Sequence, residues 1–258
     1  MAKSAKLTMI RRQEIIASYA SLVRQARNGD MILLYRGPIK TWIVHPRGVI
    51  VHTMEEAGNL TERLFLNSKQ IYEGHVGCLA AHPKGFIIRR GDNFLVNGTD
   101  LVCRGGFEYW ASHKEGVIVK KANKFLVNNK RVILECTCGA FCSHPQGVLI
   151  DRGDELWLNG QKLLYKGRFD HWSSHPQGVV VGREGGLWLN GKILLCMDPC
   201  KAWLSCRQGI VVESGDKLLL NNQILLYRGV FTDWAPHDKG VVIRQGNELW
   251  LVIHKQAN

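Results

Sequence analysis

The stretch His144-Pro145-Gln146-Gly147-Val148-Leu149-Ile150 decides the fold of this chain, because variants of it recur at a fixed distance along the sequence. The other copies of its first four residues, in some of which the proline is replaced, begin at His45, His82, His113, His175, Cys206 and His237. The first interval is 37 residues and the next five are 31 residues each. A large apolar residue stands three positions before each copy: Trp42, Leu79, Trp110, Phe141, Trp172, Trp203 and Trp234. Self-similarity of this kind is typical of repeat architectures.

One repeat unit predicts four short antiparallel strands with almost nothing spent on loops. The expected strands of the unit that begins at His144 are residues 147–150, 155–158, 162–165 and 169–173. Asn159-Gly160 predicts a type I′ hairpin turn between the second and third strands, which needs positive φ at both residues. The same signal recurs as Asn97-Gly98, Asn128-Asn129, Asn190-Gly191 and Asn221-Asn222.

The strands carry apolar residues on both sides, as in Leu156-Trp157-Leu158, so both faces of every small sheet must be covered. Radial stacking of the sheets provides this cover. The last unit stops after two strands, at 240–243 and 248–251, whereas the chain opens with strands at 32–37 and 41–44 that match the missing pair. These four strands predict a composite blade that closes a ring of seven.

Residues 31 to about 254 therefore resemble the β-propeller superfamily. The resemblance implies an all-β, seven-bladed β-propeller, closed by N-terminal strands that complete the last blade. The Trp-Asp dipeptide of WD40 blades is missing, since its nearest echo, Asp233-Trp234, has the reverse order. The likeness is thus one of architecture rather than of a named family, and a fold alone does not fix a function.

Residues 1–30 form a separate N-terminal segment ahead of the propeller domain at 31–258. This segment holds six basic residues and two acidic ones. Apolar residues recur at helical spacing within 7–28, and Asn28-Gly29 is a stop signal. We expect one amphipathic helix packed on the ring, either as a cap or plug of the propeller or as an arm that binds a partner.

The composition excludes several classes of protein. The 258 residues are 45% apolar and 22% charged, as in soluble globular proteins. No run of 18 apolar residues predicts a membrane span, and charges at Arg11, Arg12 and Glu14 argue against a secretory signal. The eight cysteines occupy unrelated positions of the repeat, so we expect reduced thiols and a cytoplasmic protein. The net charge of +12 favours an anionic partner, either nucleic acid or an acidic protein.

Hairpin geometry sorts the turns onto the two sides of the disc. Turns between the first and second strands and between the third and fourth share one side, where charges roughly balance. The other side is predicted to be positive, because only Asp100, Glu115 and Asp238 oppose its basic residues. Its candidate partner-binding residues are Lys69, Lys84, Lys130, Arg131, Lys162, Lys192 and Lys239, accompanied by Arg47, Lys114 and Arg207. Such a surface concentrates anions, although scattered lysines also keep repeat proteins soluble.

The same side carries the residues that open each repeat. They are His45, His82, His113, His144, His175, Cys206 and His237. Each precedes the first strand of its unit, which we expect to be the innermost one, so these side chains are predicted to surround the mouth of a central channel. Three roles fit this position: hydrogen bonding to a neighbouring blade, holding an anion or polar ligand, and metal binding. The last is disfavoured because ligands spread round a ring lie too far apart for one ion.

Two further groups of residues are predicted to pack rather than to bind. Cys136, Cys138, Cys142 and His144 do not match the spacing of structural zinc sites, so we expect no metal there. Tryptophans fall at two positions shared between repeats, which indicates packing between blades rather than stacking on bases.

Nothing in the sequence predicts catalysis. There is no Walker loop, no Gly-x-Ser-x-Gly and no His-Glu-x-x-His motif, so we expect no catalytic residue and no cofactor. One irregular feature is the long turn from His52 to Glu62, with Glu55 and Glu56, which we expect to be an exposed loop and a point of contact. The leading hypothesis is a non-catalytic scaffold that binds an acidic protein or nucleic acid on its positive side. The alternatives are a small-ligand, carbohydrate-binding or catalytic propeller with a site at the channel mouth, and a purely structural subunit of a larger assembly.

Overall fold

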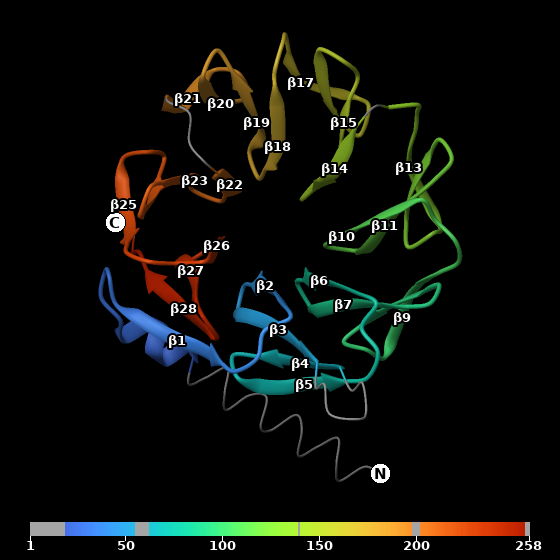
Figure 1. The fold of residues 1–258 in the computed structure, drawn as a ribbon. Coiled ribbons are helices and arrows are strands. Elements are labelled where there is room, and N and C mark those ends of the chain that lie inside the picture. The colour runs from blue at the N-terminus through green and yellow to red at the C-terminus, as the bar shows by residue number, and fades with distance from the viewer. Residues whose placement is uncertain (1–18, 55–61, 139, 198–201, 256–258) are drawn as a thin grey trace.

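The computed structural model describes residues 19–54, 62–138, 140–197 and 202–255. In these parts of the chain, twenty-eight strands form seven four-stranded antiparallel sheets, which stand as blades around a central axis (Figure 1). The chain is therefore an all-β, seven-bladed β-propeller, which confirms the fold predicted from the repeat.

Blades 1 to 6 are each built from four consecutive strands. Blade 1 contains β2 (Thr41–His45), β3 (Gly48–Met54), β4 (Glu62–Leu66) and β5 (Lys69–Glu73). Blade 2 contains β6 (Cys78–His82), β7 (Gly85–Arg90), β8 (Asn93–Val96) and β9 (Asp100–Arg104). Blade 3 contains β10 (Tyr109–His113), β11 (Gly116–Lys121), β12 (Lys124–Val127) and β13 (Arg131–Glu135).

The remaining blades follow the same order. Blade 4 contains β14 (Phe141–His144), β15 (Gly147–Asp151), β16 (Glu155–Leu158) and β17 (Lys162–Lys166). Blade 5 contains β18 (His171–His175), β19 (Gly178–Arg183), β20 (Gly186–Leu189) and β21 (Ile193–Met197). Blade 6 contains β22 (Ala202–Cys206), β23 (Gly209–Ser214), β24 (Lys217–Leu220) and β25 (Ile224–Arg228). Blade 7 combines β26 (Asp233–His237), β27 (Gly240–Gln245) and β28 (Glu248–Ile253) with β1 (Met31–Arg36).

The innermost strand of each blade is the one that ends at the first residue of the repeat motif, not the one that follows it. The strands β2, β6, β10, β14, β18, β22 and β26 line the axis and approach one another around the ring (Figure 1). The expectation for the innermost strand was therefore wrong. The turn Pro145-Gln146 joins two strands of one blade, while the crossover between blades 4 and 5 lies at 167–170. The hairpin turns and the crossovers are similarly short. The repeat therefore predicts the order of the strands but does not show which four consecutive strands form one sheet.

The ring is closed by pairing between the two ends of the described chain. β1 pairs antiparallel with β28, with Met31 opposite Val252 and Arg36 opposite Glu248. This confirms closure by an N-terminal strand. The share of strands differs from the prediction, because blade 7 takes three C-terminal strands and one N-terminal strand, whereas the stretch expected to be its fourth strand is β2 of blade 1. Closure leaves no end sheet with an uncovered face.

Asparagine side chains join two neighbouring turns in blades 1 to 6. Asn159 and Gly160 have φ of 54° and 66°, as the predicted type I′ turn requires. Asn159 Oδ1 accepts a hydrogen bond from the Val148 N–H at 2.9 Å, and its Nδ2 donates to the Gln146 carbonyl at 3.1 Å. Equivalent pairs of hydrogen bonds are made by Asn67, Asn97, Asn128, Asn190 and Asn221. We call the side of the disc formed by these asparagine turns and the His-Pro-x-Gly turns the His-Pro face.

The apolar cores lie between neighbouring blades. Trp110 of blade 3 packs on Phe94 of blade 2, with 4.7 Å between the ring centroids. Trp234 Nε1 donates to the Glu213 carboxylate of blade 6 at 2.9 Å. Burial of such a side chain contributes about 3 kcal/mol, so the innermost strands bind each blade to the one before it. This confirms that these tryptophans pack between blades.

A short helix at residues 19–25 lies beside β1 and β28, on the His-Pro face (Figure 1). Val23 and Ala26 join the core that these two strands share. Asn28 Nδ2 donates to the Lys255 carbonyl at 3.3 Å, and Lys255 Nζ donates to the Arg24 carbonyl at 3.0 Å. The helix ends before the predicted residue 28, and the predicted stretch up to residue 18 lies outside the described residues. No helix of the described ranges is long and apolar enough to cross a membrane.

Candidate anion-binding face

The repeat histidines are buried at the ends of the innermost strands, with 1% to 6% of their surface exposed. In each of the six, the backbone N–H two residues further on donates to Nδ1 at 3.0 to 3.3 Å. Because Nδ1 accepts, the ring proton of the neutral imidazole is on Nε2. His144 Nε2 lies 3.0 Å from the carbonyl oxygen of His175 on the next blade. The imidazole therefore links its own turn to the neighbouring blade.

The environment keeps these imidazoles neutral. Burial lowers the pKa of all six, and that of His45 reaches about 4 with the help of the nearby Arg47 charge. The carbonyl of His82 on the next blade opposes this shift at His45 but does not reverse it. Burial also raises the pKa of the Cys206 thiol, which takes the place of the seventh imidazole. Among the six, His144 makes the hydrogen bond to the next blade, whereas Nε2 of His45, His82, His113 and His175 is buried without one. Neutral imidazoles of this kind supply no cation for a ligand.

The channel mouth is hollow in the sector where the histidine ring is interrupted. His45, Cys206 and His237 border a cavity of about 250 Å³ between blades 1, 6 and 7. His82, His113, His144 and His175 do not border this cavity. Of the residues predicted to surround the channel mouth, His45, Cys206 and His237 therefore border this cavity, and the other four do not.

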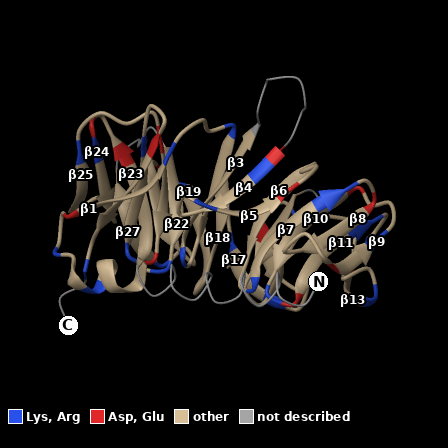
Figure 2. Cartoon of the chain, turned by 90° about the horizontal axis from the view of Figure 1, so that it is seen from below, with Lys and Arg blue, Asp and Glu red and all other residues tan. Residues whose placement is uncertain are grey.

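The basic residues predicted to bind a partner all lie on the His-Pro face, in its asparagine turns and its His-Pro-x-Gly turns. Together with the helix and the described C-terminal residues, this face carries thirteen basic and four acidic residues. The opposite face carries sixteen basic and fourteen acidic ones, and Figure 2 shows both colours there in the edge-on view. The basic residues of the His-Pro face are Arg24, Arg27, Arg47, Lys69, Lys84, Lys114, Lys130, Arg131, Lys162, Lys192, Arg207, Lys239 and Lys255; the acidic ones are Asp30, Asp100, Glu115 and Asp238.

Ion pairing distinguishes the two faces as well. On the opposite face, cations and carboxylates pair across adjacent strands, as in Arg36–Glu248 at 2.6 Å and Lys166–Glu155 at 2.7 Å. On the His-Pro face, Arg131 pairs with Glu115. The lysines at positions 84, 130, 162, 192 and 239 have no ion-pair partner among the described residues. Their charge is therefore available to a molecule from outside.

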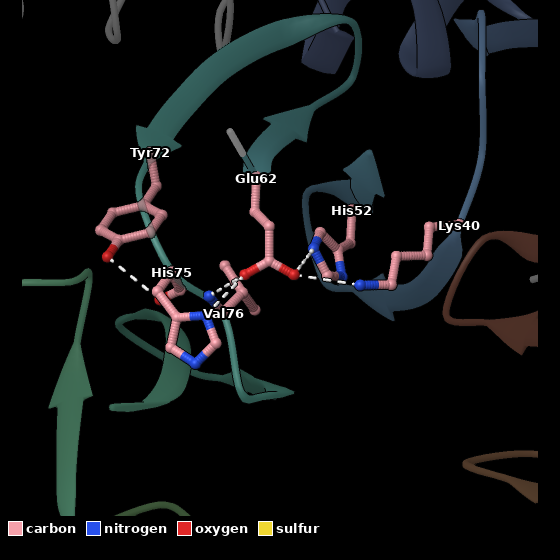
Figure 3. A network of polar contacts seen from close by, with 6 residues as sticks. All are labelled: Lys40, His52, Glu62, Tyr72, His75 and Val76. Carbon is pink, nitrogen blue, oxygen red and sulfur yellow. Dashed lines mark hydrogen bonds and ion pairs between the residues drawn. The ribbon is translucent and has the colours of Figure 1, made fainter. Parts of the chain in front are cut away.

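A polar network in blade 1 breaks the sevenfold regularity, on the face opposite to the His-Pro face (Figure 3). Glu62 is 5% exposed and accepts a hydrogen bond from the Val76 N–H. Lys40 Nζ lies 3.0 Å and His52 Nε2 3.3 Å from Glu62 Oε1, while His75 Nδ1 lies 3.1 Å from Oε2. These contacts tie β3 and β4 to the crossovers on either side of blade 1.

The hydrogen bonds to Glu62 decide its ionisation. Burial by itself raises the pKa of this carboxyl, but the Val76 N–H and the Lys40 ammonium together bring it below its ordinary value. Burial and the Lys40 charge lower the pKa of His52. The carboxylate is thus ionised and both of its oxygens have donors, and we call this network the blade 1 clasp.

Sequence reasoning did not find this clasp. The stretch from His52 to Glu62 was expected to be an exposed loop, yet both end residues are buried and belong to β3 and β4. Residues 55–61, including Glu55 and Glu56, lie outside the described residues. The extra length of this connection was the available signal, but apart from His52 the donors come from two other segments, at Lys40 and at residues 75–76.

Cys78, Cys103, Cys136, Cys138, Cys142 and Cys206 are free thiols. Burial raises the pKa of Cys138 and of Cys142 to about 11 each, which keeps them protonated at neutral pH. Protonated thiols are poor metal ligands. Within the described ranges, no three His, Cys, Asp or Glu side chains cluster in a way that would hold a metal ion.

Comparison with models of known protein families finds no match, and comparison with curated proteins finds no similar sequence.

Proposed function

We propose that this propeller is a non-catalytic scaffold that binds an acidic protein or a nucleic acid on its His-Pro face. The observation that carries the proposal is the excess of basic side chains without ion-pair partners on that face. A propeller fold is compatible with such a role, because it presents many short turns on one broad, rigid surface.

The turns do not need these lysines for their own structure. The position of Lys192, directly after the type I′ turn, is held by Gln161, Gln223 and Thr99 in other blades. The asparagine side chain of the motif makes the contacts to the backbone instead. A surface whose composition is free to vary, and which nevertheless collects one sign of charge, is what an anionic partner would select.

The contacts are expected to be electrostatic rather than stacking contacts. Among the described residues, Tyr109 is the one strongly exposed aromatic side chain, and it lies at the end of β10 that faces away from the His-Pro face. Lysines without aromatic partners contact phosphates or carboxylates and read no base sequence. Binding is therefore expected to weaken steeply with salt.

Charge reversal tests the proposal. The triple change Lys130→Glu, Lys162→Glu and Lys192→Glu should weaken binding of a fluorescent DNA duplex and of labelled polyglutamate by at least about tenfold at low salt. The matched control is Arg90→Glu, Lys121→Glu and Lys217→Glu, which removes the same charge from the opposite face. Equal binding by the two triple variants, measured by fluorescence anisotropy on proteins with unchanged melting curves, would refute the assignment of this face.

A pull-down with and without nuclease, repeated at raised salt, then separates the two kinds of partner. A partner lost on nuclease treatment is held through nucleic acid, whereas one retained is an acidic protein. Recovery that is the same at low and high salt would contradict an electrostatic scaffold.

A further inference from the structure

A cavity of about 650 Å³ lies on the His-Pro face between the helix at 19–25 and the turns around the channel mouth. The helix contributes Tyr19 and Arg24, the His-Pro-x-Gly turns of blades 1 and 7 contribute Arg47 and Lys239, and the C-terminal segment contributes Lys255. This volume is in the range of sites that enclose a small molecule. Unlike the turns, the cavity occurs at one place in the ring.

The third residue of the His-Pro-x-Gly turn varies in charge between blades, which indicates that the fold does not require a basic residue at this position. In blades 1 to 6 its carbonyl accepts a hydrogen bond from the asparagine of the next turn, and its side chain is not part of that bond. The residue is neutral in three consecutive blades, 4 to 6, and acidic in blade 3, but basic in the adjacent blades 7, 1 and 2. In order from blade 1 the residues are Arg47, Lys84, Glu115, Gln146, Gln177, Gln208 and Lys239.

Four cations and one carboxylate, Asp238, line the cavity. Lys255 Nζ is held at 3.0 Å from the Arg24 carbonyl, not by a carboxylate. Arg47 and Lys239 have no ion-pair partner among the described residues. Four like charges around one cavity repel one another unless an anion lies between them, and guanidinium groups match phosphate oxygens in geometry.

The wall of the cavity is not wholly charged. Tyr19, Ala20 and Pro46 line it with accessible apolar surface, and the buried Val23 and Ile253 adjoin it. The Tyr19 hydroxyl lies 3.5 Å from His237 Nε2, so the helix contacts the innermost strand of blade 7 through this residue. An apolar wall beside a cationic one suits a ligand that has both an anionic group and an apolar or aromatic body.

We propose that this cavity binds a phosphorylated small molecule of nucleotide size, whose phosphates contact Arg24, Arg47 and Lys239 and whose body rests on the apolar wall. The inference goes beyond the scaffold function, because a small ligand in this cavity does not need the lysines of blades 3 to 5. A bound ligand would then occupy the His-Pro face between the helix and the turns of blades 1, 6 and 7.

Calorimetric titration with pyrophosphate and with ADP tests the proposal. Both are expected to bind at one site, with ADP at least as tight as pyrophosphate because of the apolar wall. Arg47→Gln and Lys239→Gln should each weaken pyrophosphate binding by about tenfold, as loss of one charged hydrogen bond predicts. The control Lys162→Gln removes a cation from the same face away from the cavity and should change binding less than about twofold.

Several outcomes would overturn the inference. One is the absence of heat with either probe up to about 10 mM ligand, which corresponds to negligible affinity. Another is equal weakening by Lys162→Gln and Lys239→Gln, because that would indicate diffuse attraction rather than a site. Arg24→Gln on the helix serves as a second variant if a turn substitution lowers the melting temperature.

The failure of the scaffold function would look different. The triple Glu variant of Lys130, Lys162 and Lys192 should keep its affinity for ADP while it loses DNA and polyglutamate. Loss of ADP binding in that variant would contradict a separate site.

Discussion

The substitution Asn159→Ala tests whether the asparagine that joins two turns of a blade stabilises the protein. Asn159 joins two turns of blade 4, since its Oδ1 accepts from the Val148 N–H at 2.9 Å and its Nδ2 donates to the Gln146 carbonyl at 3.1 Å. Its φ is 54°, in a region that asparagine tolerates better than alanine does. Val148 is 1% exposed, so water cannot easily replace the lost acceptor.

The magnitude follows from these three effects. Each lost hydrogen bond costs about 1 kcal/mol net, and the positive φ costs alanine about 1 kcal/mol, which gives a loss of about 3 kcal/mol. Asn159→Gly avoids the φ penalty and should cost about 2 kcal/mol. Asn159→Asp keeps the acceptor for the Val148 N–H and loses only the donor to Gln146, so we expect about 1 kcal/mol. The expected order of stability is wild type, Asp, Gly and then Ala.

Urea unfolding followed by tryptophan fluorescence measures this order. With an m value near 3 kcal/mol/M, the Ala variant should shift the midpoint by about 1 M. Gln161→Ala, an exposed change beside the same turn, is the control and should cost less than about 0.5 kcal/mol. The reasoning fails if Asn159→Ala is no more costly than this control, or if the Asp variant is the least stable of the three.

A double-mutant cycle with Gly147 checks the same contact from the other side. A Cβ at Gly147 would lie 1.9 Å from Asn159 Oδ1, and the φ of Gly147 is 146°. Gly147→Ala should therefore cost more in wild type than in the Asn159→Gly background, where the clash is gone and only the backbone strain stays. Equal costs in the two backgrounds would show that the two turns are not packed as described.

Three further predictions concern stability. Burial lowers the pKa of the ring histidines, to about 4 at His45, so their neutral state stabilises the fold fully above the unfolded pKa of about 6.5. The urea midpoint should therefore decrease as the pH is lowered from about 6.5 to about 4. A midpoint that does not change over this pH range would contradict buried neutral imidazoles. Glu62→Gln should lower the free energy of unfolding in urea by about 3 kcal/mol, because it weakens every contact of the blade 1 clasp. The control Glu73→Gln, at an exposed carboxylate, should lower it by less than about 0.5 kcal/mol. Similar values for the two variants would mean that the clasp does not stabilise blade 1. Leu34→Ala in β1 should cost about 3 kcal/mol because the residue is 2% exposed, against less than about 1 kcal/mol for Leu33→Ala at 39% exposed, and the reverse order would argue against ring closure by β1.

Much of the candidate site followed from turn positions alone. The sequence placed Lys130, Lys162 and Lys192 on one side of the disc, and the structure has them there, although the innermost strand was chosen wrongly. The wrong innermost strand did not change the predicted side of these lysines, because a turn lies on the same side of the disc whether it is a hairpin within a blade or a crossover between blades. The proposed binding to that side is a separate matter that the charge-reversal experiment addresses.

The buried polar groups were harder to anticipate. His144 lies close to a carbonyl 31 positions further along the chain, and Glu62 gathers donors from residues 40, 52, 75 and 76. Whether an imidazole points toward the channel or toward a neighbouring blade depends on which strand is innermost. The spacing of the repeat is the same in both cases, so it does not distinguish them.

The sequence by itself determined the number of blades, the type I′ turns and the closure of the ring by an N-terminal strand, because these depend on a local period and on backbone conformations that particular residues require. Only the tertiary structure decided which strand lines the axis, that the histidines are buried and neutral, and that a cationic cavity lies under the helix. Those features arise where side chains from distant blades and from both ends of the chain meet. Their burial and charge depend on that packing, and no single 31-residue unit contains all the partners.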